Sequence, residues 1–150
     1  MKKLNLMLLI GLLMLLIGGC TYGSGTSKMS VEVNTLSKMS MSYQMFSGYK
    51  ATDIKVKEGE TLEVSVDIVS EKGKLDLIIE KKNTRDSEES DDSKGKAEKV
   101  YEGTDLPTSN FKVTLEEPGE YTVKVTGENH KGSYKVTWVE HQREKHDKEQ

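Results

Sequence analysis

The chain has 150 residues, of which 34% are hydrophobic and 31% charged, and its 22 basic and 25 acidic side chains leave a formal net charge of −3. This balance argues against nucleic acid as a partner, because proteins that bind nucleic acid present a positive surface to the phosphates. The only cysteine is Cys20, so an intramolecular disulfide is excluded and packing alone must stabilise the fold.

The N-terminus has the layout of a secretory signal. Lys2 and Lys3 precede an apolar run over residues 4–17, and two glycines lead to Cys20. A basic start, a short apolar segment and small residues before a cleavage site direct a chain to export. An uncleaved signal anchor is an alternative, but the run is shorter than the ~20 residues that span a bilayer.

The end of this leader, Ile17-Gly18-Gly19-Cys20, resembles the lipobox of bacterial lipoproteins. The resemblance implies that residues 1–19 are removed and that Cys20 carries a thioether-linked diacylglycerol. The expected partner is then the lipid bilayer, on the extracytoplasmic face of the cell membrane. A secreted form with a free thiol at Cys20 is the other alternative.

The mature chain would have 131 residues and, without Lys2 and Lys3, a charge of −5, which fits one domain. Its first residues are rich in glycine, serine and threonine and contain too little apolar surface to offset the entropy of ordering. We therefore expect 20–30 to be the lipidated cysteine and a flexible spacer, 31–139 the folded domain, and 140–150 a charged tail.

From about Val31 onward, apolar and polar residues alternate with the period of half-buried strands. The clearest predicted strands are 54–56, 62–68, 75–79, 100–101, 111–115, 121–125 and 134–138, with turns at 58–59, 72–73, 117–119 and 127–132. Because no helical stripe follows the leader, the strands must bury their apolar faces against a second sheet. The sequence predicts an all-β fold, a single antiparallel β-sandwich.

Four segments of this pattern also resemble a known family. Residues 59–66 (GETLEVSV), 73–79 (GKLDLII), 118–125 (PGEYTVKV) and 132–137 (GSYKVT) are similar to strands of the bacterial pre-peptidase C-terminal domain. The resemblance covers about 54–139. It implies a jelly-roll-like sandwich with an accessory, non-catalytic role in binding or targeting.

Two clusters raise the alternative of a metal carrier. Five carboxylates lie within residues 86–92 and would suit Ca²⁺, although the segment lacks the glycine and glutamate that an EF-hand requires. Met39, Met41 and Met45 bracket Tyr43 at even spacing, and thioethers select Cu(I). A solvated loop and core packing are the simpler interpretations, so we expect no metal and no cofactor.

The sequence contains no catalytic motif. His130 falls in the predicted turn 127–132, and His141 and His146 are five residues apart, which does not place them on one helical face. A nucleophile elbow, a His-Glu-x-x-His motif and a glycine-rich phosphate loop are all missing. We expect that the protein is not an enzyme.

The tyrosines give the remaining functional signal. Tyr49 and Tyr101, near predicted strand ends, are candidate ligand-binding residues, because exposed aromatic rings are platforms for sugars and peptides. The favoured function is a non-catalytic binding or interaction module of the cell envelope, with a cell-wall polymer or an envelope protein as its partner. The alternative function is a carrier of a small ligand or of a Ca or Cu ion.

Overall fold

The computed structural model describes residues 21–82 and 97–143, and these residues form seven antiparallel strands and no helix. The strands are β1 (Thr21–Lys28), β2 (Val31–Thr35), β3 (Lys38–Val56), β4 (Glu60–Lys81), β5 (Glu98–Gly103), β6 (Ser109–Leu115) and β7 (Gly119–Gln142). The predicted all-β, antiparallel fold is confirmed. Within the described residues, no helix has the length and apolar character needed to cross a membrane.

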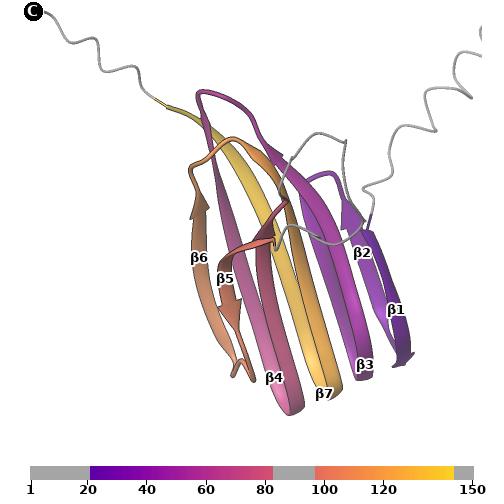
Figure 1. Ribbon diagram of the computed structural model, residues 1–150. Helices are drawn as coiled ribbons and strands as arrows, with labels where there is room; N and C mark the ends of the chain where they lie inside the picture. Colours follow the sequence, from indigo (N-terminus) through magenta and orange to yellow (C-terminus); the bar gives the residue numbers. More distant parts are fainter. Residues whose placement is uncertain (1–20, 83–96, 144–150) are drawn as a thin grey trace, which may run out of the picture.

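The strands form one hydrogen-bonded sheet that folds over into two layers (Figure 1). The order is β1-β3-β7-β4-β5, with β2 also paired to β3 and β6 also paired to β4. Each of the long strands β3, β4 and β7 bends near its middle, so its two halves lie in different layers. Layer 1 contains β1, β5 and residues 48–56, 74–81 and 119–127; layer 2 contains β2, β6 and residues 38–43, 60–70 and 132–142.

The inward-facing positions change parity where each long strand bends. In β7 the buried side chains are Tyr121, Val123 and Val125 before the bend, then His130, Tyr134 and Val136 after it. Register shifts occur at the same level in β3 and in β4. A bulge that adds one residue lets a strand turn a corner from one layer to the other while keeping its apolar side chains inside.

Two predicted turns are therefore wrong. Residues 72–73 lie within β4, and residues 127–132 lie within β7, so each pair of predicted strands is one strand with a bend. Gly73, Gly127 and Gly132, which indicate turns in the sequence, lie at the bends of these strands. The turns at 58–59 and 117–119 are confirmed, since they connect β3 to β4 and β6 to β7.

The core lies between the two layers and consists of aliphatic and aromatic side chains from their facing surfaces. Met39, Met41 and Tyr43 are buried in it, as the core-packing interpretation predicted. Met45 does not belong to this row, because the bulge after Tyr43 shifts the alternation and Phe46 takes the inward position.

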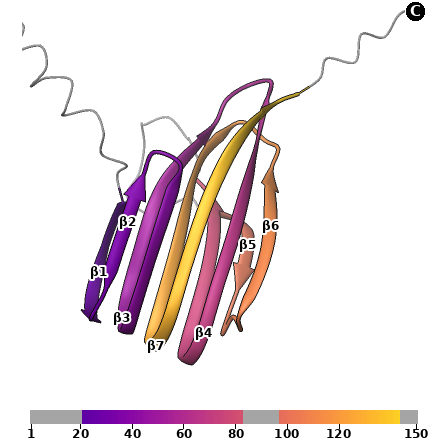
Figure 2. The same ribbon diagram turned by 180° about the vertical axis from the view of Figure 1, so that it is seen from behind.

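The predicted spacer is also wrong for most of its length. Thr21–Lys28 is strand β1, which pairs with β3 from Thr21 opposite Thr52 to Lys28 opposite Met45. An edge strand is held mainly by backbone hydrogen bonds to its neighbour, so its sequence can be poor in apolar residues. A count of apolar residues therefore does not identify β1 as a strand. The sandwich thus extends beyond 31–139 at both ends, since β7 continues to Gln142. The start of β1 and the end of β7 both lie at the end of the sandwich opposite the bend (Figure 2).

Candidate functional site

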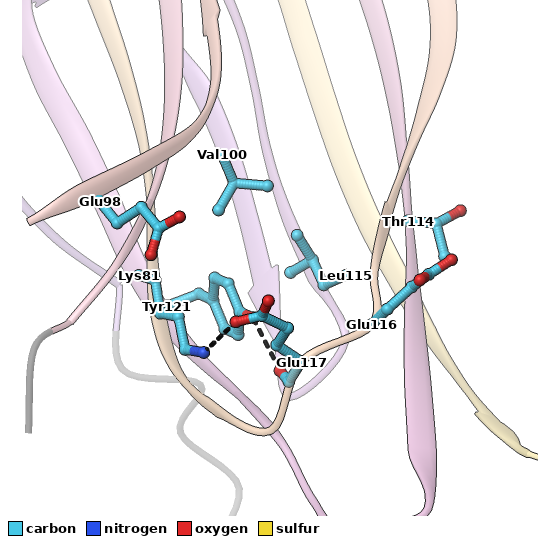
Figure 3. Close-up of a pocket in the computed structure, with 8 residues that line it drawn as sticks. All are labelled: Lys81, Glu98, Val100, Thr114, Leu115, Glu116, Glu117 and Tyr121. Carbon is cyan, nitrogen blue, oxygen red and sulfur yellow. Dashed lines mark hydrogen bonds and ion pairs between the residues drawn. The ribbon is translucent and has the colours of Figure 1, made fainter.

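A cleft opens between the two layers along the edge formed by β5 and β6, which pair with opposite halves of β4. Its volume is about 240 Å³. The lining residues are Lys81, Glu98, Val100, Thr114, Leu115, Glu116, Glu117 and Tyr121 (Figure 3). Leu115 and Tyr121 are buried beneath it, whereas the three glutamates are exposed around its mouth.

One glutamate of the cleft is neutralised within the structure. The Nζ atom of Lys81 lies 2.6 Å from the Oε2 atom of Glu117, and the Tyr121 hydroxyl donates a hydrogen bond of 2.7 Å to the Glu117 carbonyl (Figure 3). The hydrogen bond between the two side chains raises the pKa of Lys81 and lowers the pKa of Glu117. Both groups are therefore held in their charged forms.

The other two glutamates of the cleft form no such close pair. Glu98 comes from β5, and its carboxylate points toward Lys81, whose pKa it helps to raise (Figure 3). Glu116 comes from the turn after β6, and its side chain extends toward Thr114, away from Lys81 (Figure 3). The mouth thus has three carboxylates and one ammonium group above an apolar floor. This arrangement favours a ligand that offers hydroxyl or cationic amino groups.

The opposite edge of the sandwich has a smaller opening of about 120 Å³ between β1 and β2. Met41 and Phe46 lie beneath it, and the Lys50 Nζ atom bridges the layers to the Glu32 Oε2 atom at 2.8 Å. Because its polar groups already satisfy each other, this opening is the weaker candidate.

The two tyrosines predicted from the sequence do not form one platform. Tyr49 lies on the outer face of layer 1, where the Lys124 Nζ atom stands 4.9 Å from its ring centroid. Tyr101 lies opposite the buried Ile79 and packs inward, with its ring centroid 5.1 Å from that of Phe111. Tyr101 therefore joins β5 to β6 beside the cleft, and Tyr49 stands on a separate surface.

A buried polar network at the bend was not expected from the sequence. The Tyr43 hydroxyl lies 2.8 Å from Nδ1 of His130, and the Ser70 Oγ atom lies 3.0 Å from Nε2 of the same ring. These residues belong to β3, β7 and β4, so one imidazole connects all three long strands. His130 is fully buried, and burial lowers its pKa, which favours the neutral ring.

The alternation of the last strand indicates that His130 points inward, but the predicted turn at 127–132 interrupts that alternation. Tyr134 and Val136 occupy inward positions of the last strand, and extending the same alternation backwards places His130 inside. The cleft had no comparable signal. Glu98 and Glu116 line one cleft only because β5 and β6 pair with opposite halves of β4.

Within the described residues, the fold does not bring further possible ligands together to support the metal-binding alternatives. Met39 and Met41 are packed in the core, and the carboxylates of 86–92 lie outside the described residues, as does Cys20. Within residues 21–82 and 97–143, no group of three or more histidine, cysteine, aspartate or glutamate side chains is placed to hold a metal ion.

No protein-family model and no curated protein match the chain. Among solved structures, it is similar to TmCBM61 in complex with β-1,4-galactotriose, with 17% identity, coverage of 82% of this chain and 88% of that one, and a TM-score of 0.42. It is also similar to a family 11 carbohydrate-binding module from Clostridium thermocellum bound to a mixed-linked tetrasaccharide, with 15% identity, coverage of 81% and 86%, and a TM-score of 0.38.

A third similar structure is the CBM22-1 xylan-binding domain from Paenibacillus barcinonensis, with 9% identity, coverage of 84% and 83%, and a TM-score of 0.38. Identities and TM-scores this low do not establish a shared ligand. The fold class follows from the strands of the chain itself: this is an all-β protein in which one antiparallel sheet folds into a sandwich.

Proposed function

We propose that the protein is a lipid-anchored, non-catalytic binding module on the extracytoplasmic face of the cell membrane, and that the cleft between β5 and β6 binds a cell-wall polymer. The leader and Cys20 support the location. The cleft, lined by the glutamates Glu98 and Glu116 above an apolar floor, is the observation that carries the binding role.

The open shape of the cleft suits a polymer better than an enclosed small molecule. It lies along an edge of the sandwich and opens to solvent, so one unit of a longer chain can occupy the cavity. The exposed side chain of Val100 offers apolar contact to a sugar ring, and the carboxylates that line the cleft accept hydrogen bonds from hydroxyl or ammonium groups.

The charge of the mouth predicts a preference that can be measured. We expect a cationic glucosamine oligomer to bind more tightly than the neutral N-acetylated oligomer of the same length. The double variant Glu98→Gln, Glu116→Gln is expected to lose about tenfold to a hundredfold in affinity for the cationic oligomer. Each glutamine still accepts a neutral hydrogen bond, so each substitution removes only about 1 kcal/mol, the difference between a charge-assisted and a neutral hydrogen bond. Isothermal titration of both oligomers measures this.

A matched control is Glu102→Gln, which removes a carboxylate from β5 outside the cleft, where Glu102 pairs with Lys99. Its affinity should equal that of the native protein. Tyr101→Ala should weaken binding, because the Tyr101 ring packs against Phe111 beside the cleft. Tyr49→Ala should leave affinity unchanged, because Tyr49 lies on the outer face of layer 1, away from the cleft. Equal affinity of the native protein and the double variant would rule out this cleft as the site.

The anchor is tested separately. We expect the native protein to collect in the detergent-rich phase of a cloud-point separation and to incorporate labelled fatty acid, because acyl chains transfer into apolar phases at about 0.8 kcal/mol per methylene. Cys20→Ser should abolish the incorporation. Native protein in the aqueous phase, with a free sulfhydryl at Cys20 by mass spectrometry, would contradict the anchor and leave the cleft untouched.

A further inference from the structure

The short strand β2 and the turns on either side of it expose an unusual concentration of apolar side chains. Val31 is 68% exposed and Val33 44%, and both point to the outer face of layer 2. Met29, before the strand, is 81% exposed, and Leu36, after it, is 69% exposed. Half of the eight large apolar side chains that are exposed in the described residues therefore lie within one eight-residue segment.

β2 is also an edge strand, and it carries neither proline nor an outward-facing charge, two features that protect edges from pairing with another strand. β5 carries Glu98, Lys99 and Glu102 within six residues, and β6 carries Lys112 and follows Pro107. Charges and proline discourage further pairing at such edges, whereas an uncharged apolar edge is a template for it. β2 has one charge, Glu32, and that side chain points inward to Lys50.

The sequence of β2 is complementary to itself in one antiparallel register. With Val33 opposite Val33 of a second copy, Val31 faces Thr35 and Glu32 faces Asn34, so a carboxylate meets an amide donor. Within one copy, the Asn34 Nδ2 atom already donates a hydrogen bond of 2.6 Å to Glu32. Moving the centre of pairing to Glu32 would bring two carboxylates together, which disfavours that register.

We propose that two copies of the protein associate through their β2 strands, antiparallel and centred on Val33, around a two-fold axis perpendicular to layer 2. The axis keeps the outer faces of both copies on the same side and gives an isologous interface. If the axis is normal to the bilayer, both Cys20 residues lie at the same height, so the dimer is compatible with two lipid anchors. The clefts between β5 and β6 lie at the far edges and stay open.

The register can be tested by cysteine cross-linking of the full chain, in its membrane or in solution. Residues directly opposite each other in an antiparallel pair have Cβ atoms about 4.5–5.5 Å apart, close enough for a disulfide after small adjustments. We expect Val33→Cys to form a dimer under mild oxidation. We also expect Val31→Cys mixed with Thr35→Cys to form a heterodimer faster than Val31→Cys alone.

Val139→Cys is the matched control, because Val139 is 56% exposed on the same layer but lies on β7, away from the edge. It should cross-link at least tenfold more slowly than Val33→Cys. Equal rates for Val139→Cys and Val33→Cys would overturn the proposed dimer, and so would equal rates for Val31→Cys and Val33→Cys. These outcomes do not depend on ligand binding in the cleft or on acylation of Cys20.

Discussion

Replacing His130 with leucine is expected to lower the free energy of unfolding by about 2–4 kcal/mol. The leucine fills much of the same volume but can neither donate nor accept a hydrogen bond. The Tyr43 hydroxyl and the Ser70 hydroxyl then lose the partner that lies 2.8 and 3.0 Å away in the native protein. Each buried or partly buried hydroxyl left without a partner costs about 1–3 kcal/mol.

Chemical denaturation of the native protein, Tyr43→Phe, His130→Leu and the double variant measures the effect. Since the two side chains share one hydrogen bond, the double variant should cost at least about 0.5 kcal/mol less than the sum of the single variants. His141→Leu is the control, because His141 is exposed near the end of β7 and its replacement should change stability by less than about 0.5 kcal/mol. Additive single effects would show that the network does not connect the strands.

The same histidine gives stability a predictable pH dependence. Burial holds the pKa of folded His130 below its ordinary value of 6.5, and its polar contacts within the described residues, Tyr43 and Ser70, carry no charge. Below about pH 6.5 the unfolded chain takes up a proton that the folded chain does not, so stability falls until the folded pKa is reached. The loss between about pH 7.5 and about pH 5.5 should be smaller in His130→Leu than in the native protein.

Among the described glycines, Gly132→Ala is expected to have the largest effect on stability, more than about 4 kcal/mol or a failure to fold. Gly132 has a φ of +145°, which side chains of L-residues rarely adopt, and a Cβ atom here would overlap the backbone oxygen of Val69. The obstacle is backbone in β4, next to Ser70, which lies opposite Gly132 in the ladder. Neither strand can move without disturbing the bend of the other.

Gly59→Ala separates the cost of a positive φ from the cost of the backbone overlap. Gly59 also has a positive φ, +77°, but nothing lies within 4 Å of an added Cβ atom. Its replacement should cost about 1–2 kcal/mol, from the backbone conformation alone. Thermal unfolding of both variants provides the comparison, and similar melting temperatures would mean that β4 and β7 are not in tight contact at the bend.

The tight bend also explains why sequence patterns misidentified it. Residues 127–132 contain two glycines between two well-formed alternating segments, which is the ordinary signature of a hairpin turn. A turn and a bulged bend both need glycine, and both interrupt the alternation. Only the pairing of β7 with β3 and β4 on both sides of the bend distinguishes them.

The candidate site shows the same limit more strongly. The sequence favours Tyr49 and Tyr101 as ligand-binding residues because exposed rings bind ligands, but the register of β3 and β5 places the two rings on opposite sides of layer 1. Glu98 and Glu116 belong to segments with no shared pattern in the sequence. They line one cleft because the two halves of β4, separated by its bend, pair with different edge strands: one half pairs with β6 and the other with β5.

The sequence by itself determined the strand content, the inward positions within each half-strand and the turns at 58–59 and 117–119, because alternation and turn chemistry act between near neighbours in the chain. Only the tertiary structure decided that β1 is a strand, that β4 and β7 bend instead of ending, and that His130 connects the three long strands through Tyr43 and Ser70. Those features depend on backbone pairing and on contacts between residues far apart in sequence, such as Tyr43 with His130, which no local pattern records.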